Sequence, residues 1–335
     1  MSRLFRDVEG GPLCPQGSVV CIGAFDGLHL GHRALVRHAV SRARELAVPA
    51  VALTFEPLPR EFFARDGKPA RLLLPRAKVE GLWELGIDLV GLLRFNARFA
   101  AIEAEAFVRD MLVRRLQARE VWVGPGFRFG KGRAGDIGVL QRMGAAHASE
   151  GHGFVAGEIA PVLLDGERVS STRIRTALAA GDFATAARLL GRAYAIGGRV
   201  VRGARLGRTL GYPTANLRFG GKVPPLSGIF ATRVHGVGDV PLPSVSSFGT
   251  RPTVDGTEPL LEAHLFDFDG DLYGRRIHVE FVARLRDEAK FPDLPALVAQ
   301  MHDDAAQARH ALIPEQESAH PRAGFPPKAG QQASA

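Results

Sequence analysis

The stretch VVCIGAFDGLHLGH, from Val19 to His32, decides how the first half of this chain is interpreted. It opens as a buried strand, Ser18–Ile22, and closes where apolar residues begin to recur at helical spacing. Gly23 and Gly27 permit a sharp turn between the two and a close approach of the backbone to a bound group. Because the start of a helix presents unpaired N–H groups and partial positive charge, this turn predicts an anion site.

His29 and His32 are three residues apart, so at the start of a helix they fall on one face. Two imidazoles there can donate hydrogen bonds to phosphate oxygens and stabilise charge that builds on a phosphorus under attack. The segment is neither a Walker A loop nor a GxGxxG turn. Two alternatives stay open: a metal site, for which the sequence offers no third ligand nearby, and a capped helix with surface histidines.

Helices and strands alternate through the first half of the chain. We expect strands at 18–22, 50–55, 87–93, 120–124 and 154–164, and helices at 32–47, 75–85, 103–116, 136–148 and, broken at Gly181, at 170–190. Such alternation predicts an α/β domain with a mostly parallel sheet, whose ligands bind at the carboxyl ends of the strands.

The pattern changes near Gly191. Glycine and proline separate short strands, which we expect at 194–201, 228–236, 243–249, 260–268 and 275–285. This spacing is typical of a small antiparallel barrel or sandwich. One helix, 294–312, closes the unit, and the polar, proline-rich tail after it lacks periodicity, which predicts disorder. The predicted domains are therefore 1–188 and 189–312, followed by a disordered tail, 313–335.

The composition bounds the class of protein. The 335 residues carry a net charge of +8 and are 46% hydrophobic, enough for about two globular domains. Cys14 and Cys21 form neither a disulfide framework nor a CxxC metal cluster, which fits a reducing cytoplasm. No apolar stretch approaches the roughly 18 residues of a membrane span and no signal peptide is visible, so we expect a cytoplasmic protein with no membrane partner. The basic balance suits anionic ligands, either nucleotides or nucleic acid, unless the arginines only solvate helix faces.

A serine-rich helix start offers polar groups to an anion site. In RVSSTRIRTALAAGD, 168–182, Ser170 or Ser171 can cap a helix, and Arg173 and Arg175 bring guanidinium groups suited to phosphate. The alternative is an ordinary capped amphipathic helix.

A glycine-rich loop follows the fourth expected strand. In VGPGFRFGKGRAGD, 123–136, Phe127 and Phe129 either stack on bound rings or only anchor a surface loop.

The second domain contains GGRVVRGARLGRTLGYPTANL, 197–217. Its glycines leave room beside a phosphate chain. Thr214 and Asn216 place a hydroxyl and an amide in fixed register, and such oxygens suit Mg²⁺, which also holds nucleotide phosphates. The alternative is a glycine-rich turn beside a barrel strand.

The strand LLEAHLFDF, 260–268, puts Glu262 and His264 on one face and Leu261, Ala263 and Leu265 on the other. Glu262 is either simply solvated or a general base for a hydroxyl that attacks phosphorus.

In combination these motifs resemble one family. GAFDGLHLGH is similar to the phosphate-binding HxGH motif of the nucleotidyltransferase superfamily, in the form found in bacterial bifunctional riboflavin kinase/FMN adenylyltransferases, the FAD synthetases. VALTFEPLPREFF, LRFNARFAAIEAEAFV, VGPGFRFGKGRAGD and RVSSTRIRTALAAGD follow in that family's order, and PTAN resembles its kinase motif. The resemblance covers roughly residues 18–308.

The resemblance implies a Rossmann-like nucleotidyltransferase domain, 1–188, and an antiparallel β-barrel kinase domain with a closing helix, 189–312. It further implies that the second domain phosphorylates riboflavin with ATP and that the first transfers AMP from ATP to FMN, giving FAD and pyrophosphate. ATP is then a co-substrate and Mg²⁺ the cofactor. Riboflavin, FMN and ATP are the expected partners, and nucleic acid is not.

The family's site residues carry over onto matching positions here. Catalytic roles fall to His29, His32 and Glu262. The ATP and phosphate site of the adenylyltransferase comprises Gly23, Phe25, Asp26, Gly27, Gly31, Ser170, Ser171, Thr172 and Arg175, with Phe127, Phe129 and Gly130 in a flavin and ATP loop. In the kinase, the resemblance assigns ATP and phosphate to Gly198, Gly203, Gly207, Gly211 and Pro213, Mg²⁺ to Thr214 and Asn216, and the flavin to Arg286, Glu288 and Phe291.

The chain departs from the family in its first domain. Leu58 stands where the family has histidine, Leu73-Leu74 where it has threonines, and Pro125-Gly126 where it has an acidic or amide pair. A first alternative is therefore a riboflavin kinase whose N-terminal domain has lost adenylyl transfer. A second is a basic RNA-binding protein, against which the 7% aromatic content argues, because RNA readers stack bases on aromatic platforms. The sequence leaves open whether the chain forms a homo-oligomer.

Overall fold

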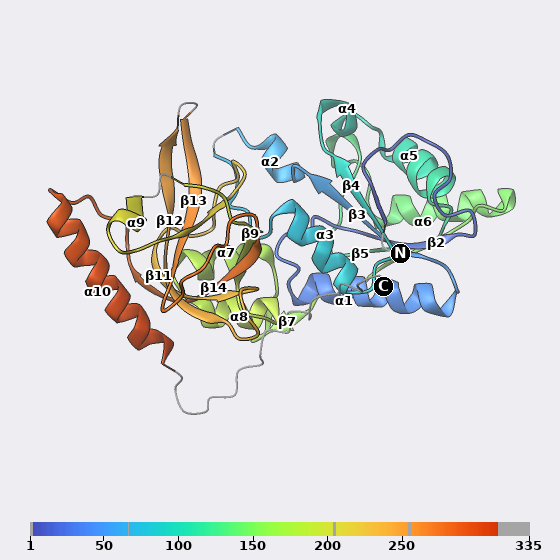
Figure 1. The fold of residues 1–335 in the computed structure, drawn as a ribbon. Helices are drawn as coiled ribbons and strands as arrows, with labels where there is room; N and C mark the ends of the chain where they lie inside the picture. Colours follow the sequence, from blue (N-terminus) through green and yellow to red (C-terminus); the bar gives the residue numbers. More distant parts are fainter. Residues whose placement is uncertain (1–2, 66, 204–205, 254–255, 314–335) are drawn as a thin grey trace, which may run out of the picture. The chain divides into compact units, whose positions relative to one another are not determined.

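The computed structural model describes residues 3–65, 67–203, 206–253 and 256–313. The chain divides into two compact units (Figure 1): Met1–Thr176 with Phe219–Pro225 form the first, and Ala177–Arg218 with Leu226–Ala335 the second. The tail predicted to be disordered lies outside the described residues, apart from its first residue.

A six-stranded parallel sheet organises the first unit. Its order is β1-β4-β3-β2-β5-β6, and every neighbouring pair is parallel. The strands are β1 (Arg3–Phe5), β2 (Ser18–Ile22), β3 (Ala50–Glu56), β4 (Leu89–Arg94), β5 (Ala118–Val123) and β6 (Val155–Glu158). This confirms the predicted sheet and adds β1, a short edge strand that the sequence pattern did not indicate.

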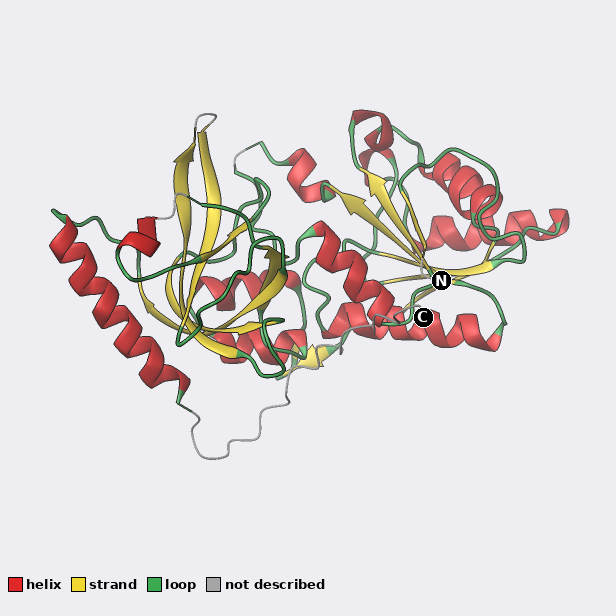
Figure 2. Ribbon diagram, viewed as in Figure 1, coloured by secondary structure: helices red, strands yellow, loops and turns green. Residues whose placement is uncertain are grey.

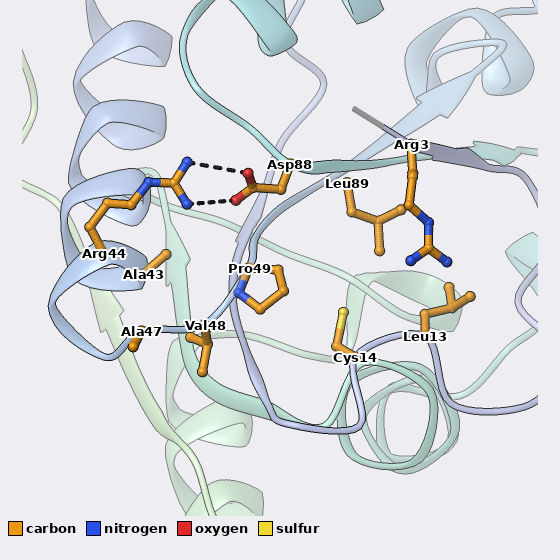
Figure 3. A pocket seen from close by; sticks show the side chains of 10 residues that line it. All are labelled: Arg3, Leu13, Cys14, Ala43, Arg44, Ala47, Val48, Pro49, Asp88 and Leu89. Atoms are coloured by element: carbon orange, nitrogen blue, oxygen red, sulfur yellow. Dashed lines mark hydrogen bonds and ion pairs between the residues drawn. The ribbon is translucent and has the colours of Figure 1, made fainter. Parts of the chain in front are cut away.

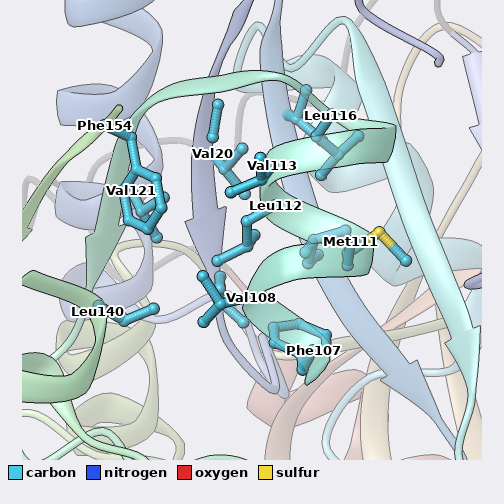
Figure 4. Close-up of a cluster of buried hydrophobic side chains, with 14 of the residues drawn as sticks. Val20, Phe107, Val108, Met111, Leu112, Val113, Leu116, Val121, Leu140 and Phe154 are labelled. Carbon is cyan, nitrogen blue, oxygen red and sulfur yellow. The ribbon is translucent and has the colours of Figure 1, made fainter. Parts of the chain in front are cut away.

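Helices cover both faces of this sheet (Figure 2), and alternate strand residues supply two separate cores. Val19 and Cys21 pack with α1 (Leu30–Glu45) and α3 (Pro75–Glu84). Val20 and Ile22 pack on the other side with η1 (Val108–Arg115), a π-helix that continues α5 (Ala104–Phe107), and with α6 (Ile137–Ala146); Figure 4 shows the side chains of η1 in this core. Burial on both faces explains why β2 is apolar at every position but the first.

Short elements complete the first unit. They are α2 (Pro59–Phe63), α4 (Ala97–Ala100), η2 (Lys131–Arg133), η3 (His147–Glu150), β7 (Leu163–Leu164), β8 (Glu167–Arg168) and most of α7 (Ser171–Ala179). None of the described helices, in either unit, combines the length and the apolar character needed to cross a bilayer.

The second unit is an antiparallel barrel (Figure 1). Its sheet runs β10-β13-β12-β11-β14-β9, and a backbone bond from Val201 N to Asn216 O, 2.9 Å, joins the residues after β9 to β10. The strands are β9 (Ala195–Arg199), β10 (Ala215–Arg218), β11 (Gly228–His235), β12 (Leu242–Thr253), β13 (Gly256–Leu265) and β14 (Arg276–Arg286). Because β9 and β10 stand at the two ends of the strand order, this bond closes the sheet, and the second unit is a barrel rather than a sandwich.

Among the described residues, the second unit contains the last three residues of α7 and the helices α8 (Phe183–Leu190), α9 (Leu206–Thr209) and α10 (Leu294–Leu312). The closing helix α10 packs Ala308 and Leu312 against Ala231 of β11 and Phe266. On the other face of β11, Phe230 lies inside the barrel, with its ring 5.2 Å from that of Phe281.

Candidate active sites

The loop between β2 and α1 has an unusual backbone. Phe25, Gly27 and Leu28 have φ angles of 50°, 92° and 45°. Positive φ is uncommon outside glycine and costs conformational energy, so such residues persist where the surroundings hold them. Here the Ser171 hydroxyl donates to the Asp26 carbonyl at 2.8 Å, and the Asp26 carboxylate accepts the N–H groups of Leu72 and Leu73 at 3.1 and 3.0 Å. The loop is therefore fixed by two other segments of the unit.

The two histidines lie together, as the spacing predicted. His29 is the N-cap of α1, and its Nδ1 accepts the His32 N–H at 3.2 Å. Their rings stack with centroids 3.7 Å apart. Burial, together with the neighbouring His29, Lys78 and Arg168, lowers the pKa of His32 well below its usual range. His32 is thus neutral near pH 7 and able to donate one hydrogen bond without carrying charge.

The glycines of this turn lie close to rings. A Cβ at Gly23 would lie 3.0 Å from the Phe25 ring, and one at Gly31 would lie 3.2 Å from the His29 ring. The backbone is therefore packed closely on its own aromatic side chains at both ends of the loop.

Asp26 and Arg175 form an ion pair in which the Asp26 carboxylate is buried and the Arg175 side chain is partly buried. Arg175 Nη2 lies 2.5 Å from Asp26 Oδ2, and its Nε donates to the Ala70 carbonyl at 2.5 Å. Burial raises the pKa of Asp26, while the adjacent Arg175 acts in the opposite direction. The Arg175 side chain of α7 therefore connects the turn after β2 to the segment that contains Ala70.

The start of α7 confirms the predicted cap. Ser170 Oγ accepts the N–H of Arg173 at 3.3 Å. The Arg173 guanidinium binds the carbonyls of the β7–β8 hairpin, including Glu167 at 3.1 Å, while Thr172 is exposed. Of the four residues predicted from this motif, Ser171 and Arg175 contact the turn after β2 directly.

Lys78 is a functional candidate that the sequence analysis did not assign. It is fully buried on α3, and its Nζ donates to the carbonyls of Phe55, 2.9 Å, and Ala24, 3.4 Å. Burial lowers its pKa to about 7. The available signal was a lysine four residues before the buried Leu82, on the apolar face of a helix.

A second buried charge lies beside it. Arg71, which is fully buried, pairs with Glu56 at 2.9 Å and with Glu61. Lys222, from the part of the chain that rejoins the first unit, lies 2.5 Å from Glu56. Burial opposes ionisation of Glu56, yet Arg71 and Lys222 hold the pKa of Glu56 below its usual value.

The aromatic loop is anchored from within. The rings of Phe127 and Phe129 stack 5.5 Å apart, and both pack against the core that contains Phe107. A Cβ at Gly130, where φ is 73°, would lie 2.8 Å from the backbone of Ala104, so this position needs glycine. Gly126 also has positive φ, 71°, but nothing lies within 4 Å of a Cβ placed there. The interpretation that the two rings anchor the loop is supported.

A hollow of about 430 Å³ lies elsewhere on the first unit (Figure 3). It is lined by Arg3, Cys14, Arg44 and Asp88, among others, and Arg44 Nη1 lies 2.9 Å from Asp88 Oδ2. Arg3 begins β1, and Asp88 precedes β4. The hollow is therefore at the amino ends of the strands, the edge opposite the predicted phosphate site.

In the second unit, the PTAN segment pairs with the strand of the predicted base. Asn216 on β10 lies directly opposite Glu262 on β13, and Glu262 lies opposite Ser247 on β12. Directly opposed residues share a face of the sheet. As the period of two predicted, Leu261 and Ala263 are fully buried, and Glu262 is partly exposed.

The Asn216 amide has one atom that the protein does not satisfy. Its Nδ2 donates to the carbonyl of Thr214 at 3.1 Å and to the Thr214 hydroxyl at 3.3 Å. Its Oδ1 is buried and has no hydrogen-bond partner among the residues that the structure describes. Mg²⁺ takes oxygen ligands, and Asn216 Oδ1 and the Thr214 hydroxyl supply two oxygens within one short segment, so these residues fit that ion.

The predicted glycines surround this segment. A Cβ at Gly203 would lie 2.6 Å from Asn216 Oδ1, and one at Gly207 would overlap the Tyr212 carbonyl. Gly211 has φ of 80°, and a Cβ at Gly198 would lie 3.3 Å from Leu217. Gly203 is thus the glycine closest to the unpartnered oxygen.

The loop after β14 lies partly over the same strands. A Cβ at Gly249, two residues beyond Ser247 on β12, would overlap Glu288 Oε1. Arg286, by contrast, binds to α10: its Nε and Nη2 donate to the buried carboxylate of Asp304 at 2.7 and 2.6 Å. The Phe291 ring lies 5.6 Å from the Arg286 guanidinium carbon.

Comparisons with known proteins agree with this geometry. The family described as FAD synthetase matches residues 12–173, and that described as riboflavin kinase matches residues 190–312. Curated bifunctional riboflavin kinase/FMN adenylyltransferases include one from Escherichia coli, 44% identical over 92% of this chain and 97% of its own length. Another, from Haemophilus influenzae, is 39% identical over 92% of this chain and 98% of its own length.

A solved structure described as a macrolide-efflux protein from Streptococcus pneumoniae has the same fold. It superimposes with a TM-score of 0.72 at 29% identity, over 92% of this chain and 99% of that one. Its description names another activity, whereas both family matches and the curated relatives agree with one another. This chain belongs to the family of bifunctional riboflavin kinase/FMN adenylyltransferases.

Proposed function

We propose that this chain makes FAD from riboflavin in two ATP-dependent steps, with riboflavin kinase activity in residues 189–312 and adenylyl transfer to FMN in residues 1–188. The observation that carries the kinase assignment is the register of the barrel. It sets the carboxylate of Glu262 directly opposite Asn216, whose Oδ1 is buried and unpartnered among the described residues.

In the kinase step, Glu262 accepts the proton of the ribityl hydroxyl as that oxygen attacks the γ-phosphorus of ATP, the bond from the γ-phosphorus to the bridging oxygen breaks, and ADP leaves. Thr214 Oγ1 and Asn216 Oδ1 would hold Mg²⁺, which neutralises phosphate charge when it is bound. The glycines around PTAN keep side chains away from the phosphate chain. Glu288, whose carboxylate lies against Gly249, would contact the flavin together with Arg286 and Phe291 of the same loop.

In the adenylyl transfer step, a phosphate oxygen of FMN attacks the α-phosphorus of ATP and pyrophosphate leaves. His32, neutral because it is buried, and His29 donate hydrogen bonds to the phosphate oxygens at the start of α1. Asp26, Ser171, Arg175 and Lys78 act mainly by holding the strained loop in place. We see no need for a covalent enzyme intermediate.

The two steps need only small molecules, ATP and Mg²⁺, and we propose no nucleic-acid partner. Cys14 and Cys21 are both free and buried, which fits the proposed cytoplasmic location.

The test is a time course with riboflavin, ATP and Mg²⁺ in which FMN and FAD are separated. We expect FMN to appear first and FAD to follow. FMN that accumulates without FAD, and no pyrophosphate from FMN plus ATP, would instead support the kinase-only alternative. Neither flavin product, together with tight RNA binding, would support the RNA-binding alternative.

A further inference from the structure

The turn that carries the proposed magnesium ligands is held by a histidine that no step above uses. His264 Nδ1 lies 2.9 Å from the carbonyl oxygen of Pro213, the residue before Thr214. A carbonyl can only accept, so His264 Nδ1 carries the proton and donates. Proline has no N–H, which leaves this carbonyl as the only backbone polar group by which the turn can be held at that residue.

The position of His264 follows from the register. Glu262 faces Asn216 across β13 and β10, and His264 is two residues further along β13, on the same face. On the other strand, Pro213 and Thr214 lie just before β10 begins at Ala215. The proposed base and this histidine thus project from one strand toward the two ends of the same four-residue motif.

A second contact ties the same turn to the closing helix. The Tyr212 hydroxyl lies 2.6 Å from His302 Nδ1 on α10, and the Tyr212 ring lies 4.8 Å from that of His264, edge to face. The Tyr212 N–H donates to the Gly207 carbonyl at 2.7 Å. Tyr212 therefore links the glycine-rich loop, the PTAN turn and α10.

We propose that His264 is a positioning residue for the kinase reaction. Its Nδ1–H fixes the Pro213 carbonyl and so preforms Thr214 and Asn216 as a Mg²⁺ site, while the Tyr212–His302 bond ties that turn to α10. This inference rests on the proposed magnesium site. Without the bond from His264, the turn must be ordered when the metal binds, so metal affinity falls while the chemistry at Glu262 stays intact.

The test compares His264→Leu with His264→Asn in the full chain. Asparagine can place an N–H donor where Nδ1 was, and leucine cannot. For His264→Leu we expect the Mg²⁺ concentration for half-maximal FMN formation to rise about 3- to 10-fold, with an unchanged KM for riboflavin. His264→Asn should recover most of the affinity. FAD formation from FMN should stay normal in both variants.

Direct metal binding supplies a readout apart from activity. Mn²⁺ is titrated into the protein with ADP present, and free Mn²⁺ is followed by electron paramagnetic resonance. The site at Thr214 and Asn216 should bind Mn²⁺ in the unaltered protein and bind it about 3- to 10-fold more weakly in His264→Leu. His310→Leu makes the same chemical change on an exposed turn of α10 and should behave as the unaltered protein.

Tyr212→Phe removes only the hydroxyl bond to His302. It should raise the Mg²⁺ concentration for half-maximal FMN formation by less than His264→Leu does. An unchanged Mg²⁺ midpoint in His264→Leu, or no recovery in His264→Asn, would overturn the positioning role. Asn216→Ala separates the two proposals. If that variant weakens metal binding and His264→Leu does not, only the positioning role is wrong; if Asn216→Ala has no effect, the magnesium site itself is wrong.

Discussion

Around the turn between β2 and α1, single residues have strained backbone angles or buried charges. Such features lower the stability of the fold. Lys78 is fully buried, and Phe25 and Leu28 have positive φ. Each feature costs stability and is retained only because neighbouring hydrogen bonds fix it. All three residues lie in or against the turn that contains His29 and His32.

The pKa of Lys78 predicts a pH dependence of stability. Its folded pKa of about 7 is below the ordinary 10.5, so between these pH values the unfolded chain binds more protons and stability rises with pH. Lys78→Met removes this contribution. The stability of the unaltered protein relative to the variant should therefore improve by about 2 kcal/mol from pH 7 to pH 9.

Both tryptophans, Trp83 and Trp122, lie in the first unit, so their fluorescence during denaturant unfolding reports that unit. Lys68→Met, at an exposed lysine, is the control and should show no such pH effect. If the Lys78→Met difference is the same at both pH values, the lysine is charged in the folded protein throughout this range.

His32 should act as a neutral donor. His32→Ala is expected to leave FMN formation intact and to slow FAD formation about 10²- to 10³-fold, because a positioned donor to the transition state is lost. His32→Gln, which keeps an uncharged N–H, should lose less. The rates of both steps are measured from riboflavin and from FMN separately. Near-normal FAD output from His32→Ala would refute the role.

At the scale of elements, the boundary between the units is set by packing rather than by the change of pattern. The alternation of strands and helices ends near residue 188, which is where the sequence predicts the division. Yet Phe183 of α8 has its ring 6.0 Å from that of Phe230 and 6.1 Å from that of Phe281, both in the barrel. Leu189 and Leu190 of the same helix are fully buried.

Two fragments test the importance of α8. Residues 177–313 retain α8, whereas residues 189–313 lack Phe183 and all but the last two residues of this helix. Both should make FMN and no FAD, but the shorter should unfold at least about 5 °C lower, because losing a buried phenylalanine costs about 3–5 kcal/mol. Thermal unfolding by circular dichroism makes the comparison. Equal midpoints would show that α8 is dispensable, and two folded but inactive fragments would place the kinase elsewhere.

At the scale of the whole molecule, two sites with different chemistry share one chain. The attacking group of the kinase step is an alcohol, which needs a base, whereas FMN brings a phosphate that is already ionised at neutral pH. Glu262→Gln should therefore reduce kcat for FMN formation about 10²- to 10⁴-fold, with little change in riboflavin binding. The same variant should make FAD normally when supplied with FMN.

The measurement is FAD formation from riboflavin and, in parallel, from FMN, with circular dichroism as the control for folding. Loss of both activities in a folded protein would contradict the separation of roles. Loss of neither would leave Glu262 as an ordinary partly exposed strand residue.

The sequence alone determined the order and type of the main elements, and it contained both the GAFDGLHLGH motif and the PTAN motif. Local periodicity was sufficient for β2, α1 and the apolar and polar faces of β13, because a strand's faces alternate and a helix's face repeats every three to four residues. The nearness of His29 and His32 was also local, since three residues in a helix cannot separate them. Family resemblance added the site residues, which periodicity does not encode.

Only the tertiary structure decided what depends on partners far apart in the chain. β1 and β10 are too short for a pattern and exist because β4 and β13 pair with them. Lys78 and Arg71 look like surface residues in sequence, but carbonyls and carboxylates from other segments make their burial tolerable. The pairing of Asn216 with Glu262, forty-six residues later, is likewise a matter of register, because a slip of one residue would turn the base to the other face of the barrel.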